Sequence, residues 1–162
     1  MLDYPEVASR LIVAMLVGCV IGLDRNLHGK PTGMKTLGLV ALGASLATMA
    51  SQNFHFGAGA FDSDAASRTI QGLITGIGFL GAGVIVHGTG SERIHGLTTA
   101  ASIWVTAAMG IVCGLGAWQV ALIALAVVLV LFLAGRPLER LLHRRWLGKS
   151  EDERAAIAHH EE

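Results

Sequence analysis

The sequence predicts an all-α membrane protein, a bundle of about five transmembrane helices, and two observations carry this prediction. Hydrophobic residues make up 52% of the chain and charged residues only 15%, whereas soluble domains average about 25% charged residues. The charges are also unevenly placed, because between residues 37 and 135 they fall only in two short clusters, 62–68 and 92–93. The stretches between these clusters are apolar over lengths that suit a bilayer.

Five apolar stretches account for the predicted spans, and the first three are separated by polar segments. The run 97–134 would form a helix about 57 Å long if it were unbroken, which is near twice the hydrocarbon thickness of a bilayer. It must therefore fold back, and Gly114-Leu115-Gly116 supplies the turn. The first stretch has no basic segment before it and no clear cleavage site after it, so we interpret it as a retained span. The predicted spans are 7–23, 37–51, 69–86, 97–113 and 118–134.

Positive charges predict the direction of insertion. An odd number of spans places the two termini on opposite sides of the membrane. Of the Lys and Arg residues, ten would share the side of the C-terminus and only Arg10 and Arg68 would lie on the other. The positive-inside rule then predicts a plasma-membrane protein with its N-terminus outside and its C-terminus in the cytoplasm.

The segment after the fifth predicted span is basic. In residues 136–147 the leucines 138, 141 and 142 share one face, which favours a short amphipathic helix on the anionic inner leaflet. A stop-transfer anchor without a further role is the alternative. Residues 148–162 are polar, and we expect a disordered tail there.

The third span contains Gly76-Ile77-Gly78-Phe79-Leu80-Gly81, a literal match to G-x-G-x-x-G. A dinucleotide site would need a strand before this motif and an acidic residue about 20 positions after it, and its turn would leave backbone groups unsatisfied within a bilayer. We therefore interpret the glycines as helix-packing faces, since close backbone approach drives helix association in lipid.

Two glycine faces predict that the third span is the central helix of the bundle. Gly72, Gly76 and Gly83 project within about 40° of one another, and Gly78 and Gly81 project roughly opposite. The first span offers a partner through its own G-x-x-x-G pattern. The predicted packing residues are Gly18, Gly22, Gly72, Gly76, Gly78, Gly81 and Gly83.

Polar residues gather at one predicted level of the membrane. Thr98, Thr99 and Ser102 lie on one helical stripe about 100° wide, which suits the wall of a polar crevice or ion path. Hydroxyls that bond to their own helix, or to a neighbouring helix, are the alternative, and hydroxyls alone favour it. The predicted functional polar cluster is Asp24, Arg25, Lys35, Glu92, Arg93, Thr98, Thr99 and Ser102.

Asp24 is the one candidate metal ligand in this cluster, although a carboxylate at a span boundary is more often solvated or paired. No nucleophile and base are placed together, which predicts that the protein is not an enzyme. No basic stripe interleaves with aromatic residues, so we expect no nucleic-acid partner. We expect no cofactor, with Mg²⁺ as the one candidate ligand or substrate.

Four motifs follow one another between residues 6 and 135, and together they resemble the MgtC/SapB family of bacterial inner-membrane proteins. They are Gly22-Leu23-Asp24-Arg25, then Lys30 to Thr36, then Arg68 with the glycine-rich segment 72–86, then Gly96 to Ala108 with Gly110. The resemblance implies a multi-pass protein of about five spans. It also implies membership of a family associated with low-magnesium adaptation, acid tolerance and survival of pathogens inside host cells.

Three departures from the family pattern favour a shorter, SapB-like member. The family often has Glu at the position of Asp24. The magnesium-linked virulence branch tends to have Asn and Cys at the positions of Thr98 and Val105. That branch also carries a C-terminal cytoplasmic domain, and the segment 136–162 is too short to form one.

We therefore expect a non-enzymatic regulator linked to Mg²⁺ or envelope-stress homeostasis. It would pack through its glycine faces against itself, as a homo-oligomer, or against another membrane protein. The family resemblance implies that the rotary ATP synthase is one such partner. The alternative is a Mg²⁺ transporter or channel. Mg²⁺ keeps several waters and needs one or two carboxylates, and the predicted spans hold no carboxylate away from their ends.

Overall fold

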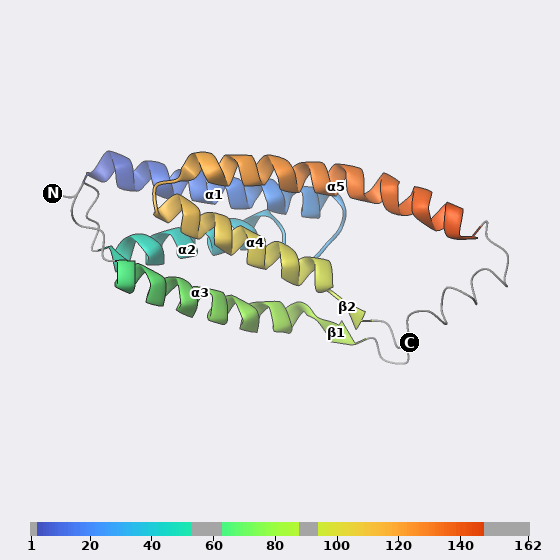
Figure 1. The fold of residues 1–162 in the computed structure, drawn as a ribbon, viewed down its shortest axis with the longest axis horizontal. Coiled ribbons are helices and arrows are strands. Elements are labelled where there is room, and N and C mark those ends of the chain that lie inside the picture. The colour runs from blue at the N-terminus through green and yellow to red at the C-terminus, as the bar shows by residue number, and fades with distance from the viewer. Residues whose placement is uncertain (1–2, 53–62, 88–93, 148–162) are drawn as a thin grey trace. The chain divides into compact units, whose positions relative to one another are not determined.

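The computed structural model describes residues 3–52, 63–87 and 94–147, which form five helices and one short β pair (Figure 1). The all-α fold class is confirmed. The β pair is antiparallel, with Val86 opposite His95 and His87 opposite Ile94. The elements are α1 (Tyr4–Leu27), α2 (Met34–Ser51), α3 (Ser63–Val84), β1 (Val86–His87), β2 (Ile94–His95), α4 (Leu97–Gly114) and α5 (Trp118–Leu147).

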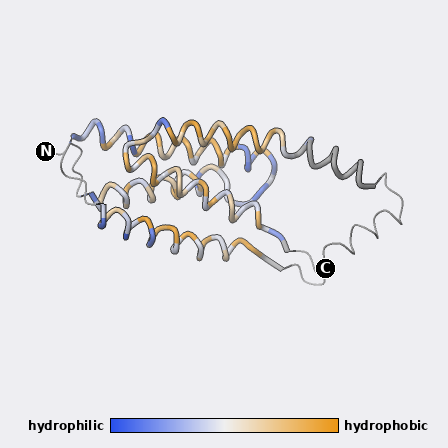
Figure 2. The backbone as a smooth tube through the Cα atoms, viewed as in Figure 1, coloured by the Kyte–Doolittle hydropathy of each residue, from blue (hydrophilic) through white to orange (hydrophobic). Residues whose placement is uncertain are grey.

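Four of the five described helices are long and apolar enough to cross a membrane, namely α1, α2, α4 and the Trp118–Gly135 part of α5. Of the described helices, α3 does not reach this hydropathy, because Arg68, Gln71 and several glycines interrupt its apolar residues. Figure 2 shows the contrast, with hydrophilic positions interspersed along α3 and a long hydrophobic stretch in α5. Length and composition thus mark four of the described helices as candidate spans, and α3 forms a helix of 22 residues at the position of the third predicted span.

Two units divide the chain, and each is described by itself. The first comprises Met1–Leu125 and contains α1 to α4 and the first residues of α5. The second begins at Ala126, and in it α5 continues as one helix through Pro137 to Leu147. Residues 136–147, predicted as a separate amphipathic helix, are therefore helical and continuous with α5. The predicted disordered tail, 148–162, lies outside the described residues.

Close backbone contact joins α1 to α2. A Cβ atom added at Gly18 would overlap the carbonyl of Leu37, and one at Gly22 would lie 2.5 Å from Met34 Cα. From the other side, a Cβ at Gly38 would lie 2.8 Å from Cys19 Sγ. Such distances are shorter than side chains tolerate, so glycine at these positions lets the two helices approach closely.

A second glycine seam joins α2 to α4, and the sequence analysis missed it. Gly110 faces the backbone of Ala41, whose carbonyl an added Cβ would overlap. Gly114, one turn later, would place a Cβ 2.7 Å from the carbonyl oxygen of Ser45 and 2.8 Å from Thr48 Cβ. The G-x-x-x-G pattern of α4 therefore packs on the small residues of α2, and α2 is in contact with α1, α3 and α4.

The third helix is not central in the described bundle, which differs from the prediction. It packs mainly on α4 and to a lesser extent on α2, and only Ala66 and Gly81 among its residues are buried. Larger apolar side chains face the core around Ala44, Ala107 and Ile111, and they occupy the helical face that the glycines were expected to fill. These side chains are Ile70, Leu73, Ile74 and Ile77.

The glycines of α3 mostly point away from this core. A Cβ at Gly81 would meet Ala100 Cβ at an ordinary 3.6 Å. At four other glycines, an added Cβ would have no atom of the described chain within 4 Å. These are Gly72, Gly76, Gly78 and Gly83. We call Gly72, Gly76 and Gly83, which share one helical face, the glycine surface of α3, whereas Gly78 projects roughly opposite to them. The helical period is the physical cause, because it places the isoleucine stripe on one side and these three glycines on another.

Candidate functional site

A buried arginine organises one end of the bundle. Arg25 lies in the last turn of α1 and is only 3% exposed. The chain turns back directly after it, and the backbone N–H groups of His28 and Lys30 both donate to the Arg25 carbonyl oxygen, at 3.2 and 3.0 Å. Gly29 permits this turn with a φ of 61°. The loop therefore folds back next to Arg25.

The Arg25 guanidinium ties α1 to this loop and to α4. Its Nε donates to the Pro31 carbonyl at 3.1 Å and to Thr32 Oγ1 at 3.2 Å, and its Nη2 donates to the same carbonyl at 3.0 Å. On α4, Nη1 donates to Ser102 Oγ at 3.1 Å and Nη2 donates to Thr99 Oγ1. One planar group thus fixes three separate segments, because its donors diverge at set angles.

All the acceptors of the Arg25 guanidinium are neutral oxygen atoms. Among the described residues it forms no ion pair with a carboxylate, and the neighbouring Asp24 lies 3.4 Å from His28 Nδ1 instead. Buried charges are usually paired, whereas this cation is hydrogen-bonded by neutral groups only and interacts with the charge of Asp24 through space. We call this arginine with Pro31, Thr32, Thr99 and Ser102 the Arg25 end of the bundle.

The loop residue Thr32 has an unusual backbone conformation. Its φ is 61°, a region that β-branched residues rarely adopt. Its hydroxyl donates to the Pro31 carbonyl at 2.6 Å and accepts from Arg25 Nε. Backbone strain of this kind persists where surrounding contacts enforce it, and here the guanidinium contacts both residues of the turn.

Hydroxyl groups along α4 form hydrogen bonds both within their own helix and with α1. Ser102 Oγ donates to the Thr98 carbonyl and Thr106 Oγ1 donates to the Ser102 carbonyl, each at 2.7 Å. Yet Ser102 also accepts from Arg25, and Thr99 does the same. The stripe is therefore partly satisfied by its own helix and partly used to bind the buried cation.

The structure brings together only part of the predicted polar cluster. Arg25, Thr99 and Ser102 meet directly, whereas Lys35 and Thr98 are exposed. Glu92 and Arg93 lie outside the described residues. The sequence analysis missed Pro31 and Thr32 as partners of Arg25, although the Pro-Thr-Gly turn was a signal that the loop doubles back there.

Asp24 remains a weak candidate metal ligand. His28 contacts it through Nδ1, at 2.6 Å from the carbonyl oxygen and 3.4 Å from Oδ1. No third His, Cys, Asp or Glu joins them within residues 3–52, 63–87 and 94–147. A protein site for Mg²⁺ uses one or two carboxylates with several waters, and Asp24 is the carboxylate that the described residues place at this end of α1.

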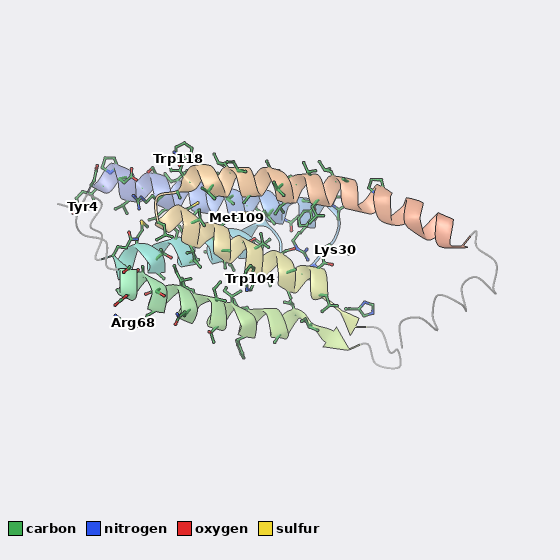
Figure 3. The ribbon with its side chains drawn as sticks, in the orientation of Figure 1. Tyr4, Lys30, Arg68, Trp104, Met109 and Trp118 are labelled. Carbon is green, nitrogen blue, oxygen red and sulfur yellow. The ribbon has the colours of Figure 1, made fainter. Side chains whose placement is uncertain are left out.

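A groove of about 560 Å³ opens beside the Arg25 cluster. It lies between the α1–α2 loop, the end of α3 and the start of α4, and Figure 3 shows Lys30 at this end of the bundle. Pro31 and Thr99, which both accept hydrogen bonds from Arg25, also form part of its wall. Its lining comprises Lys30, Pro31, Val84, His95, Gly96, Leu97, Thr98 and Thr99.

Comparison with known sequences identifies the family. A sequence model of the MgtC family matches residues 11–141, which is most of the chain. The chain belongs to the MgtC family. Membership of the MgtC family, together with the four apolar helices, identifies a bacterial membrane protein. No solved structure matches this chain.

Three curated relatives illustrate the range of the MgtC family. Protein SrpB of Synechococcus elongatus is 42% identical over 154 residues, covering 91% of this chain and 83% of SrpB. Protein MgtC of Salmonella typhimurium strain LT2 is 36% identical, covering 80% of this chain and 52% of MgtC. Protein SapB of Bacillus subtilis is 37% identical, covering 78% of this chain and 55% of SapB. The chain thus spans about half the length of the MgtC and SapB relatives.

Proposed function

We propose that this MgtC-family chain is a non-enzymatic regulator linked to Mg²⁺ and envelope-stress homeostasis, and that it acts by packing against another helix in the membrane. The observation that carries the proposal is the uncovered glycine surface of α3, at Gly72, Gly76 and Gly83. Within lipid, helices associate where small residues let their backbones approach. The α1–α2 and α2–α4 seams use such residues inside the chain, and α3 presents the same chemistry outward.

A shallow apolar groove between α3 and α4 lies on the side of α3 to which Gly78 and Gly81 project. It has a volume of about 370 Å³ and is lined by small residues, among them Gly78, Gly81 and Ala100, with Trp104 at its edge. Phe79, which shares the helical face of the glycine surface, is 81% exposed. An apolar groove with an aromatic residue at its rim suits a partner helix, because aromatic side chains supply large contact areas at few rotamers.

The hydrogen bonds of Arg25 are a second observation in favour of the proposal. They fix α4 to α1 and to the α1–α2 loop, so α4, on which α3 packs, is held in place. By the positive-inside rule the Arg25 end lies in the cytoplasm and the Arg10 end outside. A second copy of the chain, or another membrane complex such as the rotary ATP synthase implied by the family resemblance, is the proposed partner.

The experiment is co-purification from bacterial membranes with a tagged, full-length chain. Gly76→Leu adds a bulky side chain to the glycine surface, and we expect it to reduce recovery of the partner, or of a second copy with a different tag, about tenfold or more. Gly43→Leu is the matched control, because Gly43 on α2 also has no atom within 4 Å of an added Cβ. Equal recovery with both variants would refute association through α3.

A Mg²⁺ flux assay in liposomes separates this proposal from the transporter alternative. The regulator account predicts no flux above that of empty liposomes. Flux that Asp24→Asn abolishes and Gly76→Leu preserves would establish transport and overturn the regulatory proposal.

A further inference from the structure

We propose that the groove at the Arg25 end binds the phosphate group of an anionic ligand. The inference extends the proposed function, on which its physiological meaning rests, to a ligand at the same end of the bundle. The groove has a volume of about 560 Å³, within the range of about 300–1,000 Å³ that is typical of small-ligand sites. Four features of its wall favour a phosphate.

Two basic side chains reach the groove from different elements. Lys30 comes from the α1–α2 loop and His95 from β2, and both are exposed. Lysine is a common phosphate ligand as a point charge, and an imidazole N–H can donate a further hydrogen bond. In the wall of the groove that the structure describes, no Asp or Glu opposes these two groups.

The buried charge of Arg25 lies directly behind this wall. Its guanidinium donates to the Pro31 carbonyl and to Thr99 Oγ1, and both residues line the groove. Every hydrogen-bond acceptor of Arg25 in the described chain is neutral, and Asp24, the carboxylate that acts on it electrostatically, contacts His28 Nδ1 at 3.4 Å. A phosphate in the groove would add a negative charge on the other side of the guanidinium's acceptors, at short range, where screening by water is weak.

Thr99 presents a buried donor that the protein does not use. Its side chain is among the buried groups, at 4% exposed, and its oxygen accepts from Arg25 Nη2. Its hydroxyl hydrogen is donated to no carbonyl or side chain in the described part of the chain. Buried polar hydrogens normally find acceptors, and an oxygen atom of a ligand in the groove is placed to be one.

The start of α4 adds backbone donors to the same wall. The N-cap of this 18-residue helix is Gly96, which has no side chain to cap the first N–H groups. The first N–H groups of a helix have no intrahelical partner, and with the helix dipole they favour anions. Gly96, Leu97, Thr98 and Thr99 all line the groove, so these donors lie beside Lys30 and the Thr99 hydroxyl.

Two sources could supply the phosphate, namely a free phosphate compound from the cytoplasm or the headgroup of an anionic lipid in the inner leaflet. The experiment uses the full chain, purified without partner, in nanodiscs. One arm titrates inorganic phosphate in phosphatidylcholine nanodiscs by calorimetry. The other arm compares the thermal unfolding midpoint in phosphatidylcholine with that in phosphatidylcholine containing phosphatidylglycerol.

Lys30→Gln is the diagnostic variant and Lys35→Gln its control. Both lysines are exposed and lie at the same end of the bundle, but only Lys30 lines the groove. We expect Lys30→Gln to weaken the binding of inorganic phosphate about tenfold, if that arm responds. If the phosphatidylglycerol arm responds, the variant should remove most of the shift in the unfolding midpoint. Lys35→Gln should leave both unchanged.

The arm that responds identifies the source of the phosphate. A saturable response to inorganic phosphate supports a soluble ligand, and a response to phosphatidylglycerol alone supports a lipid headgroup. No response in either arm, or equal losses in both lysine variants, would overturn the inference. Because the protein is tested without a partner, such a failure is distinct from a failure of the co-purification experiment.

Discussion

Arg25 Nη1 donates a hydrogen bond to Ser102 Oγ at 3.1 Å, joining residues that are 77 positions apart in the chain. This bond and the contact with Thr99 connect α1 to α4 at the end of the bundle where the α1–α2 loop folds back. At the Arg25 end, one side chain therefore adds polar contacts to the apolar packing of Ile21, Leu37 and Ile103. Several consequences for stability can be measured.

Replacement of Arg25 by methionine should destabilise the protein. The variant leaves two buried hydroxyls and the Pro31 carbonyl without their donor, and each such loss costs about 1–3 kcal/mol. We expect a total loss of at least about 2 kcal/mol in the free energy of unfolding, measured by SDS titration in mixed micelles. Arg25→Lys should recover only part of this loss, since an ammonium group cannot reproduce the divergent donors. Wild-type stability in Arg25→Met would show that the buried cation is not a structural clamp.

The two groups of glycines should behave differently on substitution. Gly110→Leu would drive a side chain into the backbone of Ala41, so we expect loss of the folded monomer in detergent. Gly76→Leu meets open space in the described chain and should leave the monomer folded. Size-exclusion chromatography with circular dichroism would compare them. A misfolded Gly76→Leu monomer would mean that α3 is packed differently from the arrangement described above.

Gly96 should tolerate no side chain. Its φ of 94° belongs to the left-handed region, and an added Cβ would overlap the carbonyl of Val84. Gly96→Ala should therefore lower the free energy of unfolding by about 1–3 kcal/mol. Gly43→Ala, in a helix with open space around it, should be neutral or raise stability by about 0.5–1 kcal/mol. Similar thermal unfolding midpoints for these two variants would contradict the described start of α4.

Arg10 should stabilise the opposite end of the bundle. Its Nη1 donates to the Gly114 carbonyl at 2.8 Å, at the C-terminus of α4, while Nε donates to Glu6 Oε1 at 2.8 Å. A cation at a helix C-terminus is favourable, and we expect Arg10→Gln to cost about 1 kcal/mol. Glu6→Gln should cost less, because Glu6 is partly exposed and the bond to Gly114 remains. The same SDS titration distinguishes them, and a larger loss for Glu6→Gln would be inconsistent with the capping role.

Hydropathy was sufficient to predict helices at all five positions, and the turn between α4 and α5 followed from the length of one apolar run. The role of the third helix could not be obtained in this way. Its glycines and its isoleucines both repeat with the helical period, and the pattern alone does not say which stripe faces the core. In the structure Ile70 and Ile74 face it, while Gly72 and Gly76 do not.

The candidate site was accessible to sequence reasoning only in part. The hydroxyl stripe of α4 and the charged end of α1 could be placed at one level of the membrane. The hydrogen bond from Arg25 to the Pro31 carbonyl depends on how the α1–α2 loop folds back. That loop conformation requires a positive φ at Thr32, which the residue type does not favour. The second glycine seam, at Gly110 and Gly114, could not be assigned from the pattern alone, because glycine near the end of a helix is also typical of a turn.

Photo-cross-linking in native membranes tests the central claim, that the chain works through the exposed side of α3, most directly. p-Benzoylphenylalanine in place of Phe79 would report what lies against this side, and the same group in place of Leu39, an exposed residue of α2, is the control. The account predicts a discrete cross-linked protein, either a second copy or a distinct membrane partner, from position 79 and none from position 39. Cross-links to lipid alone at position 79, or the same protein product from both positions, would contradict it.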